Sequence, residues 1–115
     1  MINLSEEETI ILENMLRKLN AEEQELTNKS EKPLVHHEDH EQLSLIIDGS
    51  GYAQKNDTVY NVKRGSLILL NKFDKHSFMA KDNNKLKILH LHTDKIYGEE
   101  DRNIDEVVSS KWLTI

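Results

Sequence analysis

The chain contains no cysteine, a single proline and no long apolar run. Without cysteine it forms no disulfide framework, has no thiolate nucleophile and builds no zinc finger. No apolar stretch approaches the roughly 20 residues that a membrane span requires. Neither end carries the basic and then apolar pattern of a signal segment. We therefore expect a cytoplasmic protein that does not enter a membrane.

Positive charge is also scarce, because 15 Lys and Arg residues face 21 Asp and Glu residues and give a formal net charge of −6. Neutralising the phosphates of a nucleic acid requires a basic face. No direct contact between this chain and nucleic acid is therefore expected. At 115 residues the chain has room for one domain with one modest core.

The charged residues divide this single domain into three parts. Residues 1–32 hold eight acidic and four basic side chains, residues 98–115 hold five and two, and residues 33–97 hold eight and nine. Pro33 marks the beginning of the nearly neutral middle part. We predict that helices flank a central barrel, with these segments as its boundaries.

Residues 1–32 have the pattern of an amphipathic helix. Ser5 and Glu8 have the spacing of a capping box at its start. Mostly apolar side chains then follow helical spacing: Leu12, Met15, Leu16, Leu19, Glu23 and Leu26. Such a helix packs on its own domain or pairs with a second copy, and it is too short for the pattern to decide. A second short amphipathic helix is predicted within 98–115 from its apolar residues: Ile104, Val107, Val108, Trp112 and Leu113.

The central segment changes to short strand-like runs separated by turn residues. The strand-like runs are 43–47, 58–62, 66–70 and 86–92, and turn residues occupy 49–51, 55–57, 63–65 and 82–84. This spacing favours an antiparallel sandwich or a small barrel. Because no helix alternates with these strands, a parallel α/β sheet is not expected.

All six histidines of the chain lie in the central segment, in two clusters. They are His36, His37, His40, His76, His90 and His92. Imidazoles close to carboxylates are typical of metal sites. Imidazoles and amides inside a strand-built cavity also bind the hydroxyls of a small polar molecule.

The first cluster resembles the cupin motif G-x5-H-x-H-x(3,4)-E-x6-G. Counting back from Gly49 places Gln42 at the glutamate of the motif, Glu38 at its second histidine and His36 at its first. A shift of one residue, caused by a bulge, would instead bring His37 or His40 and Glu41 into place.

The second cluster resembles the cupin motif G-x5-P-x-G-x2-H-x3-N. Gly65 and His76 occupy the glycine and histidine positions of this motif. Asn71, Phe73 and Ala80 replace its proline, second glycine and asparagine.

The resemblance implies how a metal would be held, since catalytic cupins bind iron, manganese or zinc with three histidines and a carboxylate. The set aligned here is His36, Glu38, Gln42 and His76, which lacks one imidazole and has a neutral amide, a poor ligand for these metals. We therefore expect no metal cofactor, and keep iron, manganese or zinc as the alternative.

Residues 33–97 are more similar still to the N-terminal sensor domain of AraC-type transcription regulators, in the stretches 36–51 and 65–78. The resemblance implies a small cupin jelly-roll barrel, mostly β, that encloses a small effector such as a sugar and forms a homodimer through helices. It implies a pocket lined by these residues: His36, Glu38, His40, Gln42, His76 and His90. No helix-turn-helix pair is recognised up to Ile115, so we expect DNA binding to lie elsewhere.

Structural roles remain open for several of these residues. Gln42 faces out of the barrel if Leu43, Leu45 and Ile47 face inward. His76 closes a turn at the barrel mouth or contacts the ligand. His90 shares a strand face with Ile88, which favours a hydrogen-bonded core histidine.

Three functions are therefore considered. The first is a non-enzymatic sensing cupin of the AraC type. The second is a stand-alone metal-dependent cupin enzyme, acting as a dioxygenase, isomerase or epimerase. The third is an adaptor whose acidic helices dock on a partner while side chains fill the barrel.

Overall fold

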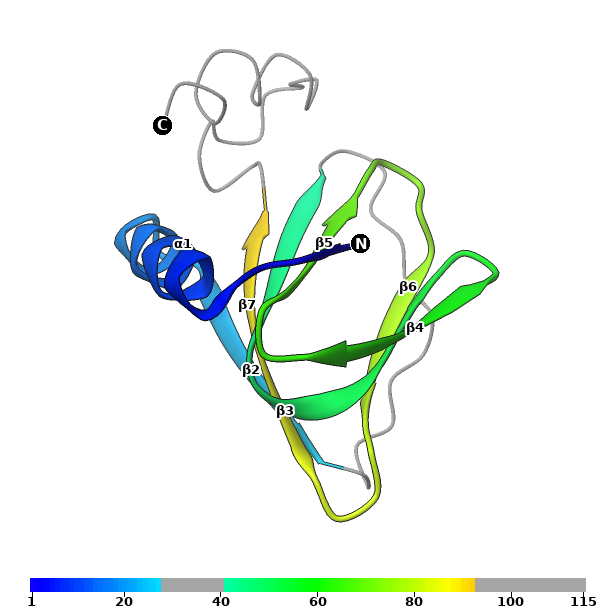
Figure 1. Cartoon of the computed structure of the whole chain (residues 1–115). Coiled ribbons are helices and arrows are strands. Elements are labelled where there is room, and N and C mark those ends of the chain that lie inside the picture. The colour runs from blue at the N-terminus through cyan, green and yellow to red at the C-terminus, as the bar shows by residue number, and fades with distance from the viewer. Residues whose placement is uncertain (28–40, 93–115) are drawn as a thin grey trace.

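The computed structural model describes residues 1–27 and 41–92, and Figure 1 shows their arrangement. In chain order the elements are β1 (Ile2–Asn3), α1 (Glu6–Lys18), β2 (Glu22–Thr27), β3 (Gln42–Lys55), β4 (Thr58–Lys63), β5 (Ser66–Leu70), β6 (His76–Ala80) and β7 (Lys85–His92). The helix predicted within 98–115 lies outside the described residues. No helix in the described ranges is long and apolar enough to cross a bilayer.

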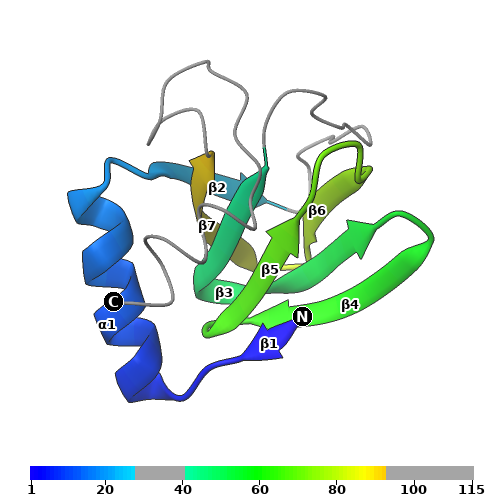
Figure 2. The same ribbon diagram turned by 90° about the horizontal axis from the view of Figure 1, so that it is seen from above.

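All strand pairs are antiparallel, and the long strand β3 takes part in two sheets. Its first half pairs with β5 and β7, which extends the sheet to the order β1-β5-β3-β7-β2. Its second half, residues 50–55, pairs with β4 and β6. The two sheets wrap around a common interior (Figures 1 and 2). The prediction of a mostly β, antiparallel barrel is confirmed.

The bend of β3 lies where the sequence predicted its end. The pairing register with β7 shifts between Ile46 and Asp48, which marks a bulge. Gly49 follows with a φ of +85°, and a Cβ at this position would overlap the carbonyl oxygen of Lys85. The prediction that β3 ends at Gly49–Gly51 is therefore wrong, because glycine here permits a bend and a close backbone approach within one continuous strand.

Helix α1 begins as its capping box predicts. The backbone N–H of Glu8 donates to Ser5 Oγ at 3.1 Å, and the backbone N–H of Ser5 donates to Glu8 Oε1 at 2.9 Å. The Ser5 backbone hydrogen bond and then the Ser5 side chain hold the pKa of Glu8 below its usual range. The negative charge of Glu8 lies in the first turn, where the helix dipole favours it.

The helix ends much earlier than the sequence predicted. Asn20 has a φ of +61°, and its N–H donates to the carbonyl of Arg17 at 3.1 Å. The N–H of Ala21 reaches back to the carbonyl of Leu16 at 3.0 Å. These two bonds form a Schellman motif around a left-handed asparagine, which terminates a helix.

The residues that follow form strand β2, so the predicted continuation of the helix to Leu26 is wrong. Strand β2 pairs with β7 along its whole length, from Glu22 opposite His90 to Thr27 opposite Lys85. The position of Leu26 is compatible with a helical spacing and also with the alternation of a strand. Pairing with the edge of β7 determines that this segment is a strand. The barrel therefore includes residues 22–27, which precede the predicted barrel boundary at position 33.

Two hydrophobic cores lie on either side of the sheet. The core inside the barrel contains Leu26, Ile46, Ala53, Val62, Ile68, Leu70, Phe78, Ala80, Leu86 and Ile88. The core under α1 contains Leu16, Leu45, Ile47, Leu89 and Leu91. Leu16 is fully buried there, so α1 packs on its own domain, as one of the two sequence alternatives proposed (Figure 2).

Candidate functional site

A cavity of about 500 Å³ lies in the barrel between β2, β3, β6 and β7. Its lining consists of Glu22, Glu23, Gln24, Leu26, Gln42, His76, Ser77, Phe78, His90 and His92. Polar side chains from four strands therefore meet in this cavity, which Leu26 and Phe78 of the barrel core also line.

The two faces of β3 explain how Gln42 comes to line this cavity. Ile46 belongs to the core inside the barrel, whereas Leu45 and Ile47 belong to the core under α1. Because side chains alternate along a strand, Gln42 and Ser44 share the interior face with Ile46. The prediction left this orientation open, and the helix decides it by covering the leucine face.

A chain of short hydrogen-bond contacts connects β3, β7 and β2 in the cavity wall. Gln42 Nε2 lies 2.8 Å from Ser44 Oγ and 2.9 Å from His90 Nδ1. Ser44 Oγ lies 2.8 Å from the same ring nitrogen. On the other side of the ring, His90 Nε2 lies 2.8 Å from Gln24 Oε1.

Gln24 contacts one ring nitrogen of His90, and side chains of β3 contact the other. An amide oxygen only accepts hydrogen bonds, so His90 Nε2 donates its N–H to Gln24 Oε1. In neutral imidazole the other nitrogen is then an acceptor with a single lone pair, and Gln42 Nε2 at 2.9 Å and Ser44 Oγ at 2.8 Å are the donor groups within reach of it. Both ring nitrogens are thus engaged by side chains of the wall.

His76 reaches the same cavity from the first residue of β6. It is only 5% exposed, and its ring meets the Phe78 ring edge-on with 6.2 Å between the centroids. Phe78 in turn lies 5.4 Å from the His90 ring. The Phe78 ring therefore lies beside both of these imidazoles of the cavity lining.

Asp74 fixes the turn that precedes His76. Its carboxylate accepts hydrogen bonds from Asn56 Nδ2 at 3.0 Å and from the backbone N–H of Asn71 at 2.9 Å, and lies 3.6 Å from Lys55 Nζ. Burial alone raises the pKa of Asp74, but the hydrogen bonds from Asn56 and Asn71 together with the charge of Lys55 bring this pKa below its usual value. The β5–β6 turn is thereby attached to the β3–β4 turn.

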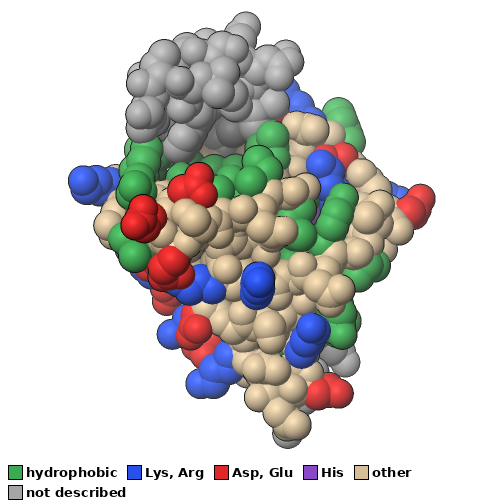
Figure 3. Space-filling model, viewed as in Figure 1, with side chains coloured by type: hydrophobic (Ala, Val, Ile, Leu, Met, Phe, Trp, Pro, Cys, Tyr) green, Lys and Arg blue, Asp and Glu red, His purple; other side chains and the backbone are tan. Residues whose placement is uncertain are grey.

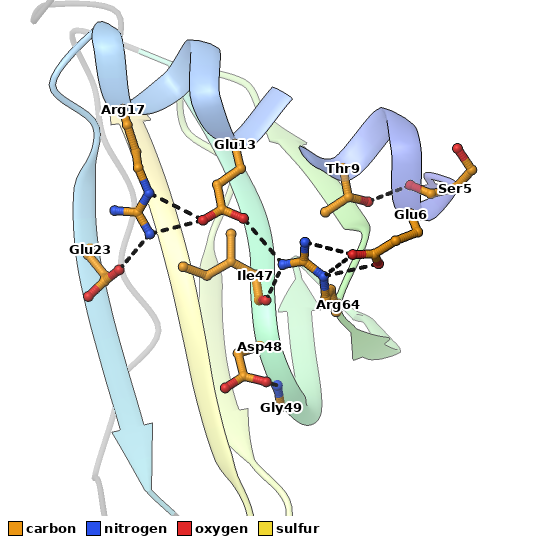
Figure 4. Close-up of polar contacts among 10 residues, drawn as sticks. All are labelled: Ser5, Glu6, Thr9, Glu13, Arg17, Glu23, Ile47, Asp48, Gly49 and Arg64. Atoms are coloured by element: carbon orange, nitrogen blue, oxygen red, sulfur yellow. Dashed lines mark hydrogen bonds and ion pairs between the residues drawn. The ribbon is translucent and has the colours of Figure 1, made fainter. Parts of the chain in front are cut away.

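A second polar network attaches α1 to the barrel (Figure 4). Arg64 Nη1 donates to the carbonyl oxygen of Ile47 at 2.6 Å and to Glu13 Oε1 at 3.2 Å. Arg64 Nη2 lies 2.9 Å from Glu6 Oε1. Hydrogen bonding to Glu6 holds the pKa of Arg64 above its usual value, and the same bond lowers the pKa of Glu6.

The network continues to the cavity lining. Arg17 Nη2 lies 3.1 Å from Glu13 Oε2 and 2.9 Å from Glu23 Oε1, and these hydrogen bonds, first to Glu23, raise the pKa of Arg17. Acidic and basic side chains accordingly lie next to one another on the side of the molecule that carries α1 (Figure 3). Glu23 thus belongs both to the helix attachment and to the cavity wall.

The structure brings together three of the six predicted site residues. Gln42, His76 and His90 line the cavity, whereas His36, Glu38 and His40 lie outside the described residues. His90 is also the hydrogen-bonded, mostly buried histidine that its strand face suggested.

Sequence reasoning missed two residues of the hydrogen-bonded wall. Ser44 was detectable, since it lies two residues from Gln42 and so shares its strand face. Gln24 was hidden because its segment was assigned to a helix.

The described residues by themselves do not fit a metal. Among residues 1–27 and 41–92, no group of three or more histidine, cysteine or acidic side chains is placed to hold an ion. Of the aligned ligand set they supply only His76 and the neutral amide of Gln42. His90 could replace a ligand only by giving up Gln24 or its partners on β3.

Known structures with the same fold are cupins. The chain is 17% identical to the Cnp3 cupin domain of Schizosaccharomyces pombe, with a TM-score of 0.57 over 69% of this chain and 58% of that chain. It is 24% identical to a predicted oxalate decarboxylase from Thermotoga maritima, with a TM-score of 0.57 over 70% of each chain. A cupin protein from Bacteroides fragilis is 14% identical, with a TM-score of 0.56 over 61% of this chain and 60% of that chain. At this identity the likeness shows the fold alone.

The sequence itself matches a family model. No curated protein matches the chain. Residues 18–99 match the model of the AraC-like ligand binding domain, which covers the described part of the barrel from the end of α1 onward. Strand β2, with Gln24 of the cavity wall, falls within the match. This match spans residues 18–99 of the 115, agrees with the observed barrel, and shows that the chain belongs to the family of AraC-like ligand binding domains.

Proposed function

We propose that this domain senses a small polar effector of the sugar type and passes its occupancy to a transcription regulator. The observation that carries the proposal is the cavity of about 500 Å³ that Gln42, His76, His90 and Phe78 line together. This volume lies within the range of small-molecule sites, which combine apolar walls with a few placed polar groups.

The chemistry of the lining supports a ligand that presents both hydroxyls and C–H groups. Amide and imidazole groups donate hydrogen bonds to hydroxyls and accept hydrogen bonds from them. The apolar side chains of Phe78 and Leu26 can pack against the C–H groups of a sugar ring. A cavity of this size also speaks against a barrel filled by side chains, which the adaptor hypothesis requires. Dimerisation through helices and a cytoplasmic location accompany this role as predictions.

Titration of sugars against the parent protein and a His76 variant tests the proposed function. We expect a panel of pentoses and hexoses, titrated in the presence of a chelator, to include a compound that binds saturably and shifts the amide NMR signals of β6 and β7. His76→Ala should weaken that binding by about tenfold or more, because a ligand group then loses its hydrogen-bond partner.

Met79→Ala is the matched control, since Met79 is 54% exposed on the same strand and does not line the cavity. It should bind like the parent protein. Absence of saturable binding across the panel, or equal affinity in the His76→Ala variant, would contradict the proposal. Stoichiometric iron, manganese or zinc in active protein purified without an affinity tag would favour the metal-dependent enzyme instead.

A further inference from the structure

The hydrogen-bonded wall of the cavity leaves one buried acceptor unsatisfied. Gln42 is 2% exposed, and its Nε2 faces Ser44 and His90. Its oxygen Oε1 has no hydrogen-bond partner among the described residues. A buried polar atom in this state is costly, and native structures contain few of them.

The orientation of the Gln42 amide follows from the groups around it. When the neutral His90 ring donates through Nε2 to Gln24, its Nδ1 is an acceptor, and the amide nitrogen of Gln42 lies 2.9 Å from it, beside Ser44 Oγ at 2.8 Å. With the ring in this neutral form, turning the amide over would place two acceptors, Gln42 Oε1 and His90 Nδ1, next to each other. The wall therefore holds the Gln42 nitrogen toward His90 and leaves the oxygen for another donor.

The charge of the lining adds a second restriction. Glu22 and Glu23 contribute carboxylates, and the described lining contains no lysine or arginine. Glu23 is paired with Arg17, which lies on α1 outside the lining. An anionic ligand would have to leave water without gaining a lysine or arginine partner from this lining, which is costly.

We propose that the cavity selects uncharged ligands that donate a hydroxyl hydrogen bond to Gln42 Oε1, and that it rejects sugar acids and phosphorylated sugars. This inference rests on the proposed function and narrows the class of effector. A ligand hydroxyl that reaches Gln42 gives Oε1 the donor that the wall lacks. The carboxylate or phosphate of a charged analogue supplies only acceptors at neutral pH and meets two glutamates.

Matched sets of compounds test the inference. Each set consists of a neutral sugar, such as glucose or ribose, its aldonate, its terminal phosphate ester and its fully O-methylated derivative, which keeps acceptors but donates nothing. Amide NMR of the whole chain measures the affinity of each compound for the cavity. We expect only neutral, donating members to bind, with an affinity at least tenfold above that of their charged and methylated counterparts.

Two pairs of variants assign the selectivity to its residues. Gln42→Met removes the acceptor at similar size and should reduce the affinity for the neutral sugar about tenfold, whereas Gln54→Met, on the same strand and outside the cavity lining, should not. The double variant Glu22→Gln/Glu23→Gln should reduce the difference in affinity between the neutral sugar and its aldonate. Glu25→Gln, on the same strand and outside the lining, should leave this difference in affinity unchanged.

The outcomes separate the two proposals. Binding of aldonates, phosphate esters or methylated sugars as tightly as the neutral parents would overturn the inference and leave the sensing function standing. Unchanged affinity in Gln42→Met would also overturn it. A panel in which no compound shifts the signals of the cavity would contradict both.

Discussion

Phe73 shows how one residue departs from the pattern of its family while its backbone keeps the family's shape. It stands at the second glycine of the cupin motif and has a φ of +69°, in the left-handed region that glycine occupies without cost. Its side chain is 63% exposed, so little packing offsets the strain. The backbone requirement of the motif persists at this turn although the glycine does not.

We predict that Phe73→Gly stabilises the domain by about 1 kcal/mol. A left-handed backbone costs a non-glycine residue roughly 1–2 kcal/mol, and the extra conformational entropy that glycine gives the unfolded chain offsets only part of this gain. Urea denaturation measures the change. Phe73→Ala retains a Cβ at positive φ and should bring no comparable gain. An equal gain in the alanine variant would show that loss of the exposed ring, and not relief of strain, is responsible.

At the scale of elements, turns attached to one another position the strands of the site. Asp74 joins the turn before β6 to the turn between β3 and β4, and Lys75 N–H completes the contact by donating to Asn56 Oδ1 at 3.0 Å. His76 follows directly. The side chain that reaches the cavity therefore begins from a fixed turn.

The depressed pKa of Asp74 predicts a pH-dependent contribution to stability. Because the folded pKa lies below the ordinary value of 3.8, the ionised carboxylate stabilises the fold above that pH, and the contribution is lost as the pH falls through the folded pKa. Asp74→Asn should cost about 1 kcal/mol near neutral pH. The difference from the parent should shrink as the pH falls below 3.8.

Urea denaturation over this pH range measures the difference, and Asp57→Asn in the adjoining β3–β4 turn is the control. Asp57 is exposed, so its variant should follow the parent at every pH. A constant difference between Asp74→Asn and the parent at all pH values would contradict the argument.

At the scale of the whole molecule, Arg64 connects parts that the sequence separates widely. It bonds the carbonyl of Ile47 at the bend of β3 and the carboxylates of Glu6 and Glu13 on α1. Arg64 itself lies between β4 and β5, so helix, bend and turn meet at one guanidinium. Ile47, whose carbonyl Arg64 bonds, also belongs to the core that Leu16 forms with the sheet.

Arg64→Met should lower the free energy of unfolding by about 1–2 kcal/mol, since a charged hydrogen bond to a part-buried carbonyl is lost while the more exposed ion pairs contribute little. Lys63→Met changes the exposed neighbour of Arg64 at the end of β4 and should alter stability far less. Chemical denaturation provides the free energies, and amide exchange should show that α1 loses protection in Arg64→Met. Equal effects of the two variants would refute this role of Arg64.

Local patterns in the sequence accounted for much of the fold. Ser5 and Glu8 specified the start of α1, because a capping box joins residues three apart. The strand-like runs between turn residues at 58–62, 66–70 and 86–92 specified β4, β5 and β7, because apolar and β-branched residues bounded by turn residues favour strands. The cupin spacing placed Gln42 and His76 in one lining.

Tertiary structure decided what depends on distant partners. The sequence of residues 22–27 is compatible with a helix or a strand. These residues form strand β2 because they pair with the edge of β7. The face of Gln42 depended on which side of β3 the helix would cover. Gln24 and His90 are 66 positions apart and Gln42 and His90 are 48 apart, so their contact follows only from the closed barrel. The sequence by itself determined the strands and the candidate polar residues. The packed sheet decided which of them meet, because hydrogen bonds between strands are formed only after the chain has brought both partners together.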